Sequence, residues 1–540
     1  MTISPRTLKL QYIIAYRTEG GPKRYDDTVW LYTTIGSLAA MPFVVYYYYE
    51  SRKKHMNELR YKKLGEAQER YRARGGDPKA VHTTLPTFTM PAEAKVWLAA
   101  FIALFVFRYL RTVVSIFTFN LYRPKRIRDK TRYTSSDVTV VVPTTFKAET
   151  ELTHCLRCIF ACSPAEVLIV CSIANVPLIK QICSLKGFKQ VDVLGVKKLN
   201  KRTQMIKALK EVETEIVVFA DDDVFWPGPQ YIDYLLAVFE DEKTGAGGTR
   251  QRARRNPGFF TNVYNFLGIS YLERRVWNNI STNAIDGSLS TLSGRTAAYL
   301  TAILQNEELY EWLERQNDDD KCLTRYVYSH GWNITIQSDP NAVLETTLED
   351  NPKYISQCMR WARGHWRGNF TVMSQESYWC SSRYWWGLYV IYVGQFQSPA
   401  LLIDGLLFGL LAGAIKGSDY TRFAFFCLAA WIFFTKIVKL IPHFLRYPQD
   451  MMYIPVSIAF SYLHGFINIY ALATQSNTHW GSQKIESLQP ARVQNEEVVP
   501  LLRNAISEGE VTGAETPGRM MVGRDYFSVS ELAQLIEVYA

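Results

Sequence analysis

Residues 215–223 read EIVVFADDD, a short apolar run that ends directly at three consecutive aspartates. Its β-branched residues are typical of a strand buried in a parallel sheet. Residues 138–144, VTVVVPT, have the same character. Further apolar runs lie at 167–171 and 190–195, and helical patterns lie at 149–161 and 200–210. This alternation predicts an α/β domain whose ligands bind at the carboxyl ends of parallel strands.

Two acidic triplets stand at positions where ligands are expected. Asp221, Asp222 and Asp223 follow the predicted strand, whereas Asp318–Asp320 precede a helical pattern at 321–328. Acids at a helix start also complement the helix dipole, and an isolated acidic triplet is usually a solvated turn. Carboxylate oxygens suit a hard divalent cation, and a positioned carboxylate suits a general base. The sequence therefore predicts a cation at the first triplet and a base, Asp320, in the second.

The pentad Gln357-Cys358-Met359-Arg360-Trp361 lies in a basic helical pattern at 354–370. An arginine binds phosphate through a fork of donors, and a tryptophan stacks on the apolar face of a sugar ring. The pentad therefore suits a diphosphate and a sugar.

If one carboxylate acts as base and no covalent intermediate forms, the displacement is single and inverts the anomeric configuration.

The composition combines membrane and soluble character. The chain is 48% hydrophobic, yet 21% of its residues are charged and its net charge is +10. A span needs about 20 apolar residues, and several stretches have that length. They lie at 29–49, 96–122, 388–415, 423–445 and 451–473. The sequence predicts an integral membrane protein with a soluble domain between two membrane regions.

Basic blocks at 52–79 and 123–132 flank the second apolar stretch. Cations near membrane segments favour the cytosolic side, so both blocks cannot be cytosolic if 96–122 crosses once. Either residues 96–122 form a re-entrant segment or lie at the membrane interface, or one basic block lies on the non-cytosolic side of the membrane. We expect a cytosolic middle domain whose basic runs contact the lipid bilayer and no nucleic acid.

The nine cysteines lack the paired spacing of a secreted scaffold. Cys155, Cys158 and Cys162 with His154 have a spacing that fits either a zinc site or one face of a helix. Reduced cytosolic thiols on a helix are the favoured interpretation.

These motifs resemble those of the processive, membrane-embedded members of glycosyltransferase family 2. That group includes hyaluronan, cellulose and chitin synthases, and the resemblance is closest to fungal polysaccharide synthases called type 2 glycosyltransferases. It covers about residues 96–483. The matching segments are 138–144, Asn200-Lys201-Arg202, Asp221–Asp223, Ser293-Gly294-Arg295, Asp319–Thr324 (DDKCLT), Gln357–Trp361 and Trp480-Gly481-Ser482.

The resemblance implies a cytosolic GT-A-type, Rossmann-like domain inserted between N-terminal and C-terminal transmembrane helices, with amphipathic interfacial helices. It also implies a role for each matching residue. The residues that would contact the nucleotide sugar are Pro143, Thr144, Lys201, Arg202, Asp221, Asp222, Gln357 and Arg360. Asp221 and Asp223 would bind Mg²⁺ or Mn²⁺, and Asp320 would be the base beside Asp319. Ser293, Gly294 and Trp361 would contact the acceptor, and Trp480 and Gly481 would gate the site.

Two features depart from the family pattern. The aspartate that usually reads uracil after the second strand is missing from residues 167–172, VLIVCS. Family topology also requires an even number of crossings between the active site and Trp480. One of the late apolar stretches should therefore be broken or interfacial, at Pro399 or Pro455.

The expected function is processive, inverting polymerisation of a UDP-sugar into a β-linked polysaccharide, extruded through the plasma membrane for a cell wall or matrix. One alternative is a membrane enzyme that adds a single sugar to a lipid, and another is a transporter or scaffold. The expected regions are a polar segment (1–28), an N-terminal membrane region (29–122), a GT-A domain (135–345), interfacial helices (346–395), C-terminal spans (396–474) and a polar tail (475–540). Within the tail, residues 529–539 are expected to form a short amphipathic segment. A cytosolic domain would leave the sequons at Asn279, Asn333 and Asn369 unmodified.

Overall fold

The computed structural model describes most of the chain. The described residues are 51, 54–55, 57–59, 61–77, 92–316, 318–375, 382–416, 421–477, 519–522 and 525–528. The apolar stretch expected at 29–49, the motif at 480–482 and the amphipathic piece expected at 529–539 lie outside them.

A seven-stranded sheet with the order β3-β2-β1-β4-β8-β6-β9 forms the centre of the α/β domain. Its strands are β1 (Val138–Pro143), β2 (Glu166–Ser172), β3 (Val191–Val196), β4 (Ile216–Ala220), β6 (Thr244–Thr249), β8 (Thr296–Leu300) and β9 (Asn333–Gln337). The first four strands are parallel, as predicted. Strand β8 runs antiparallel to both of its neighbours, so the sheet is mixed.

Strand β8 differs from what its local sequence favours. Residues 293–296 suit a loop and residues 297–304 suit a helix, but Thr296–Leu300 is a strand and only Thr301–Leu304 (α9) is helical. Ala297 and Ala298 are fully buried between β4 and β6. Tertiary burial has overridden the helix propensity of these alanines.

Helices cover both faces of the sheet. Helices α4 (Glu149–Phe160), α5 (Val176–Leu185) and α7 (Tyr231–Leu236) contribute to one core, and α6 (Lys201–Leu209), α10 (Glu307–Glu314) and α11 (Asp319–Ser329) contribute to the other. Successive residues of each strand point to opposite faces. In β4, Val217 and Phe219 accordingly enter one core, whereas Ile216 and Val218 enter the other.

A small sheet extends the domain beyond the acidic end of β4. It has the order β5-β10-β7 and comprises β5 (Val224–Phe225), β10 (Leu344–Thr346) and β7 (Gln251–Ala253). Because β5 directly follows Asp223, its pairing with β10 places Thr347 beside that aspartate, 3.2 Å from its Oδ2.

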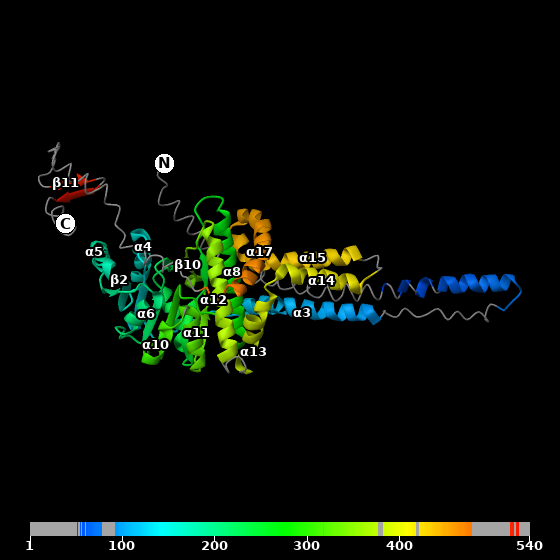
Figure 1. Cartoon of the computed structure of the whole chain (residues 1–540), viewed down its shortest axis with the longest axis horizontal. Coiled ribbons are helices and arrows are strands. Elements are labelled where there is room, and N and C mark those ends of the chain that lie inside the picture. Colours follow the sequence, from blue (N-terminus) through cyan, green and yellow to red (C-terminus); the bar gives the residue numbers. More distant parts are fainter. Residues whose placement is uncertain are drawn as a thin grey trace. The chain divides into compact units, whose positions relative to one another are not determined.

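A layer of helices separates the α/β domain from the apolar helices (Figure 1). It contains α8 (Val263–Asp286), α12 (Lys353–Gln375), α13 (Trp385–Gly387) and α17 (Ile454–Ala473). The predicted helix at 354–370 is therefore confirmed as part of α12. Helix α8 is joined to the apolar helix α3 (Ala92–Leu121) by the stacked rings of Trp277 and Phe119, whose centroids are 4.0 Å apart.

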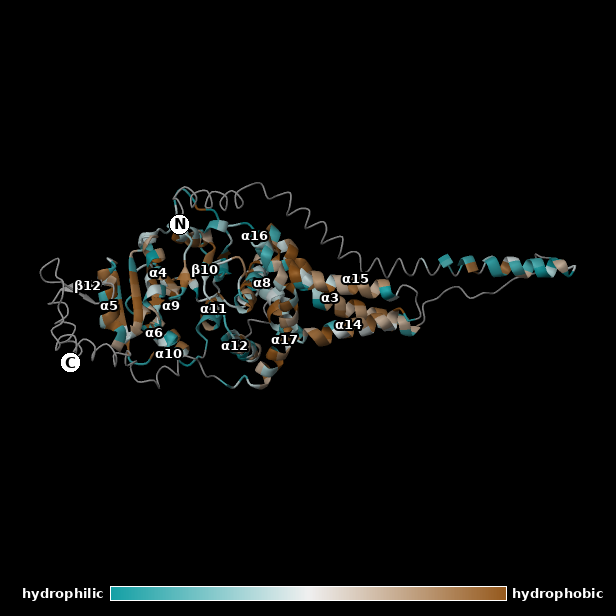
Figure 2. Ribbon diagram, turned by 90° about the horizontal axis from the view of Figure 1, so that it is seen from above, coloured by the Kyte–Doolittle hydropathy of each residue, from teal (hydrophilic) through white to brown (hydrophobic). Residues whose placement is uncertain are grey.

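Helices α3, α14 (Ala400–Ala414) and α15 (Thr421–Ile437) share an apolar core, and Figure 2 shows that hydrophobic residues predominate in them. Among the described residues, 92–121, 421–446 and 448–473 are long and apolar enough to cross a membrane. The stretch expected at 388–415 is not one helix. It comprises η8 (Leu388–Tyr392), η9 (Val393–Gln397) and α14, with a bend of 86° between residues 397 and 400, beside Pro399.

Helix α17 runs beside α8 and α12 and across the direction of α3, α14 and α15 (Figure 1). It is bonded to α12, since Trp366 Nε1 donates to the carbonyl oxygen of Asn468 over 3.0 Å and Arg363 Nε donates to Thr474 Oγ1 over 3.0 Å. Its composition suits a membrane span, and its side chains pack against α12 of the helical layer.

Residues 481–540 form a separate unit. Its described part is an antiparallel hairpin of β11 (Arg519–Val522) and β12 (Asp525–Ser528).

Candidate active site

The acidic triplet at the end of β4 is held by β1 and by the segment before β8. Thr144 donates from Oγ1 to Oδ2 of Asp222 over 2.5 Å, and the backbone amide of Asp221 donates to the carbonyl oxygen of Arg295 over 3.0 Å. Burial raises the pKa of Asp222, and the bond from Thr144 partly offsets that rise. Pro143 is buried at the end of β1. The segments predicted to bind the donor therefore meet at one edge of the sheet.

Lys201 connects the two acidic triplets. Its Nζ lies 2.6 Å from Oδ1 of Asp221 and 3.2 Å from Oδ2 of Asp319. Burial alone would lower the pKa of Lys201, but the surrounding carboxylates raise it well above its usual value. Lys201 is the first residue of α6, and Asn200 caps that helix by accepting from the amide of Arg202 over 3.0 Å. The cap fixes the point from which the lysine enters the cleft.

The second triplet begins α11, as predicted. Asp318 caps the helix by accepting from the amide of Lys321 over 3.1 Å. Burial alone would raise the pKa of Asp319, but Lys201 brings it below its usual value. Burial and repulsion from Asp319 raise the pKa of Asp320 well above the usual range. The pKa values of these two adjacent carboxylates are thus shifted in opposite directions, and Asp320 is the one that binds a proton more tightly.

Gly294 lies directly against Asp320 of α11 and close to Lys201. A Cβ at this position would lie 2.1 Å from Oδ1 of Asp320 and 3.1 Å from Nζ of Lys201. A glycine therefore lets the backbone of the Ser293–Arg295 segment approach the carboxylate. Ser293 is 7% exposed, and its Oγ accepts from Nη1 of Arg295 over 3.2 Å.

Asp223 lies apart from Lys201, beside Thr347 and Arg295. Burial, followed by repulsion from Asp221, raises the pKa of Asp223 to about 7. A cation beside these carboxylates would relieve both effects. Among the described residues, no three His, Cys, Asp or Glu side chains are grouped so that they could hold a metal ion by themselves. The cluster of His154, Cys155, Cys158 and Cys162 is therefore not such a group either. Magnesium is often held by one or two carboxylates plus substrate phosphates, and Asp221 and Asp223 fit that pattern.

The Gln357–Trp361 segment of α12 faces α8 and the Ser293–Arg295 segment. Trp361 stacks on Tyr271 of α8, with ring centroids 4.7 Å apart and planes 17° apart. The guanidinium of Arg295 lies 6.0 Å from the Trp361 ring centroid. Burial lowers the pKa of Arg360, and the carboxylates of Glu349 and Asp319 partly offset that effect.

Two residues predicted to bind the donor have polar atoms that are buried without a protein partner. Within the described part of the chain, Oε1 of Gln357 and Nε of Arg202 make no hydrogen bond. A buried unsatisfied polar atom is costly, so a ligand that bonded to it would bind favourably. Trp480 and Gly481 lie outside the described residues.

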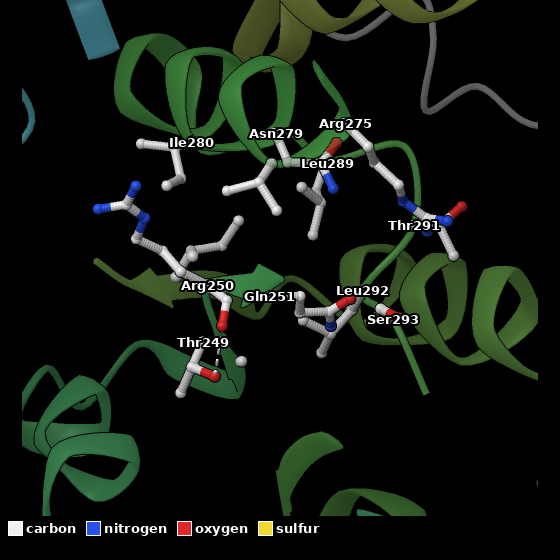
Figure 3. Close-up of a pocket in the computed structure, with 13 residues that line it drawn as sticks. Thr249, Arg250, Gln251, Arg275, Asn279, Ile280, Leu289, Thr291, Leu292 and Ser293 are labelled. Carbon is white, nitrogen blue, oxygen red and sulfur yellow. Dashed lines mark hydrogen bonds between the residues drawn. The ribbon is translucent and has the colours of Figure 1, made fainter. Parts of the chain in front are cut away.

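Sequence reasoning missed the contribution of α8. Arg275 donates from Nη1 to the Tyr271 hydroxyl over 3.3 Å and interacts electrostatically with Asp320 and Asp318. Figure 3 shows Arg275 with Gln251, Thr291 and Ser293 around a pocket at the start of the Ser293–Arg295 segment. The spacing of Tyr271 and Arg275 places both on one face of a helix. The surrounding stretch 245–293 has no clear hydrophobic periodicity, so the sequence does not mark these two residues as part of the site.

The chain matches a model named "Glycosyltransferase like family 2" over residues 136–364. A type 2 glycosyltransferase from Zymoseptoria tritici is 42% identical over 399 residues, which cover 72% of this chain and 84% of the relative. The chain is a family 2 glycosyltransferase. A hyaluronan synthase from Streptococcus pyogenes is 23% identical over 295 residues, which cover 53% of this chain and 66% of the synthase.

Among solved structures, a mannosyltransferase from Pyrobaculum calidifontis in complex with GDP-Man and Mn²⁺ aligns with a TM-score of 0.44 and 16% identity, covering 72% of this chain and 99% of that one. The family match includes the cleft residues from Thr144 to Trp361. In this glycosyltransferase, the acidic, basic and aromatic side chains described above therefore belong to the transferase domain itself.

Proposed function

We propose that this glycosyltransferase is a processive, inverting polysaccharide synthase that polymerises a UDP-sugar into a β-linked chain. The observation that carries the proposal is the junction of Lys201, Asp319 and Asp221 in one cleft, with Gly294 directly against Asp320. A donor diphosphate and a proton-accepting carboxylate require such a combination of charges in one place.

The donor would bind along the carboxyl ends of β1 and β4. Arg202, Gln357 and Arg360 would hold its diphosphate through donor groups: Nε of Arg202 is buried without a hydrogen-bond partner in the described part of the chain, and the side-chain amide of Gln357 would donate from its NH2 group. Pro143, Thr144 and Asp222 would lie beside the nucleoside. Asp221 and Asp223 would hold Mg²⁺ or Mn²⁺, which neutralises charge on the leaving diphosphate when bound.

Asp320 would accept the proton of the acceptor hydroxyl as that oxygen attacks the anomeric carbon. Burial and repulsion from Asp319 raise the pKa of Asp320, so its ionised carboxylate is a stronger base than that of an ordinary aspartate. Asp319 stays ionised beside Lys201 and keeps that ammonium near the reacting groups. A single displacement by this route inverts an α-linked donor to a β-linked product.

The acceptor would lie on Trp361, which Tyr271 and Arg295 hold in place. This platform is on α12, in the helical layer between the α/β domain and helices α3, α14 and α15. A chain that grows from the cleft would leave through a channel that the membrane region forms. The similarity to a hyaluronan synthase supports a polymer as the product.

The α/β domain would face the cytosol, where nucleotide sugars are made, and the polymer would leave through the plasma membrane toward a cell wall or matrix. The basic blocks on either side of α3 support a lipid-contacting role. The sequons at Asn279 and Asn333 are only partly buried, so they report on orientation. Glycans on either residue would contradict a cytosolic domain.

The test is incubation of purified protein in sealed vesicles with a panel of radiolabelled nucleotide sugars and Mg²⁺ or Mn²⁺. The proposal predicts a labelled polymer from a UDP-sugar, protected inside inside-out vesicles and absent from an Asp320→Asn variant. Label found only on an extractable lipid bearing one sugar would instead support the single-sugar enzyme, since the same cleft could serve a lipid acceptor.

A further inference from the structure

Lys321 follows the acidic triplet but extends away from the cleft. Its side chain is 3% exposed and passes beneath α12, where Nζ donates to Oδ1 of Asn369 over 2.5 Å and to the carbonyl oxygen of His365 over 3.2 Å. A Cβ at Gly368 would lie 2.6 Å from Cδ of Lys321. The glycine therefore makes room for the lysine to cross under the helix.

Asn369 uses both ends of its amide. Its Oδ1 accepts from Lys321, and its Nδ2 donates to Oε1 of Gln395 on η9. The side chain is 4% exposed. This asparagine is also the acceptor position of a sequon. Because the amide is buried and bonded on both sides, a glycan there is incompatible with the folded protein.

Gln395 belongs to the segment that leads into the bent membrane helix. Two residues later, Nε2 of Gln397 donates to the carbonyl oxygen of Phe107 on α3 over 2.8 Å, and Nη1 of Arg108 donates back to the carbonyl oxygen of Gln397 over 2.8 Å. Arg108 in turn pairs with Asp404 of α14 at 3.6 Å. The segment η9 is thus fixed to both α3 and α14.

We propose that Asn369 is a positioning residue that couples the helix carrying Asp320 to the membrane helices through Lys321 on one side and Gln395 on the other. The proposal rests on the proposed function for its kinetic consequence. The two hydrogen bonds set where α11 begins relative to α12 and η9. A shift at the membrane side therefore changes the position of the base without touching the donor site.

Buried polar bonds of this kind are costly to break on one side only, because the remaining partner stays unsatisfied. Asn369→Asp offers an isosteric rescue. The new carboxylate would still accept from Lys321, and Nε2 of Gln395, which has no hydrogen-bond partner in the described part of the chain, could rotate to donate to it. Asn369→Leu and Gln395→Leu remove the bond to η9 altogether.

The deciding measurement is hydrogen exchange of the full-length protein in nanodiscs, which does not depend on activity. Gln395→Leu should accelerate amide exchange in residues 319–323 of α11 about tenfold, although Gln395 is on another element. Asn369→Leu should give the same change, and the double variant should add nothing. Asn369→Asp should exchange within about twofold of wild type, because the bonds to Lys321 and Gln395 remain and only the 3.5 Å bond from Nδ2 to the carbonyl oxygen of Ile391 is lost.

The matched control is Thr371→Val, which removes the sequon and a local bond from Oγ1 to the carbonyl oxygen of Arg367 but leaves the coupling intact. It should leave exchange in α11 unchanged. In the transfer assay, Gln395→Leu should lower kcat about tenfold with the donor KM within about twofold, because only the base is displaced. A structural role alone would instead move both parameters or neither.

Acceleration confined to η9, or independent additive effects of the two leucine variants on α11, would overturn the proposal. If Gln395→Leu fails to fold, Lys321→Met tests the coupling in the opposite direction, from α11 to η9, and should accelerate amide exchange in η9. Unchanged exchange in η9 of Lys321→Met would also overturn the proposal. A wild-type protein without transfer would count against the proposed function and leave the exchange result intact.

Discussion

Gly294 lies so close to Asp320 that a Cβ on the glycine would stand 2.1 Å from the carboxylate oxygen Oδ1. Gly294→Ala should therefore displace the carboxylate and reduce kcat by about 100-fold, because small displacements of a catalytic group have large effects on rate. Steady-state transfer assays measure this change. Gly228→Ala is the matched control, since no heavy atom lies within 4 Å of its added Cβ. Equal activity of the two variants would contradict the contact.

Lys201 should compete with a divalent cation for the carboxylate of Asp221, since its Nζ lies 2.6 Å from Oδ1. Lys201→Met should bind Mn²⁺ several-fold more tightly than wild type, because a positive charge next to the cation is removed. The same variant should lose transfer activity. Electron paramagnetic resonance of free Mn²⁺ measures the affinity without substrate, and Lys201→Arg, which keeps the charge, is the control. Weaker Mn²⁺ binding by Lys201→Met would contradict competition.

The pKa of Asp320 predicts a pH-dependent gain in stability for Asp320→Asn. A carboxyl group with a raised pKa binds its proton more tightly in the folded state, so its contribution to stability is fully present at low pH and is lost as pH rises above about 4 toward the raised value. The asparagine variant avoids that loss. Its Tm should match wild type at the lowest pH and exceed it increasingly toward neutrality.

Each ~1 kcal/mol of that gain corresponds to about 2–4 °C in Tm for a domain of this size. Thermal unfolding between about pH 4 and pH 8 provides the measurement. Asp129→Asn, at an exposed position, should show no such trend. A constant difference in Tm across this range would contradict a raised pKa.

Much of this cleft was predictable from local sequence. A β-branched run ending in acids predicts a strand end, and Asp318–Asp320 before a helical pattern predict a helix start; both are confirmed. Strand β8 was not predictable because Ala297 and Ala298 favour helix locally and are held extended only by burial between β4 and β6. The roles of Arg275 and Asn369 depend on contacts between segments far apart in the chain, which periodicity does not encode.

Trp361 should affect the acceptor more than the donor. Its indole stacks on Tyr271 at 4.7 Å, outside the acidic cluster that would hold the nucleotide. Trp361→Ala should shorten the products and raise the apparent acceptor KM about tenfold, a loss of ~1.4 kcal/mol of stacking, with little change in the donor KM. Trp361→Phe keeps an aromatic face and should recover most of the product length. Gel filtration of labelled product and donor titrations separate the two effects.

The central claim is that the cleft formed by Asp221, Lys201 and Asp320 performs glycosyl transfer with Asp320 as base. The most direct measurement compares single-turnover transfer and UDP binding in wild type and Asp320→Asn. The account predicts an unchanged Kd for UDP and a transfer rate lower by about 10²–10⁴-fold in the variant. Transfer at the wild-type rate by Asp320→Asn would contradict it.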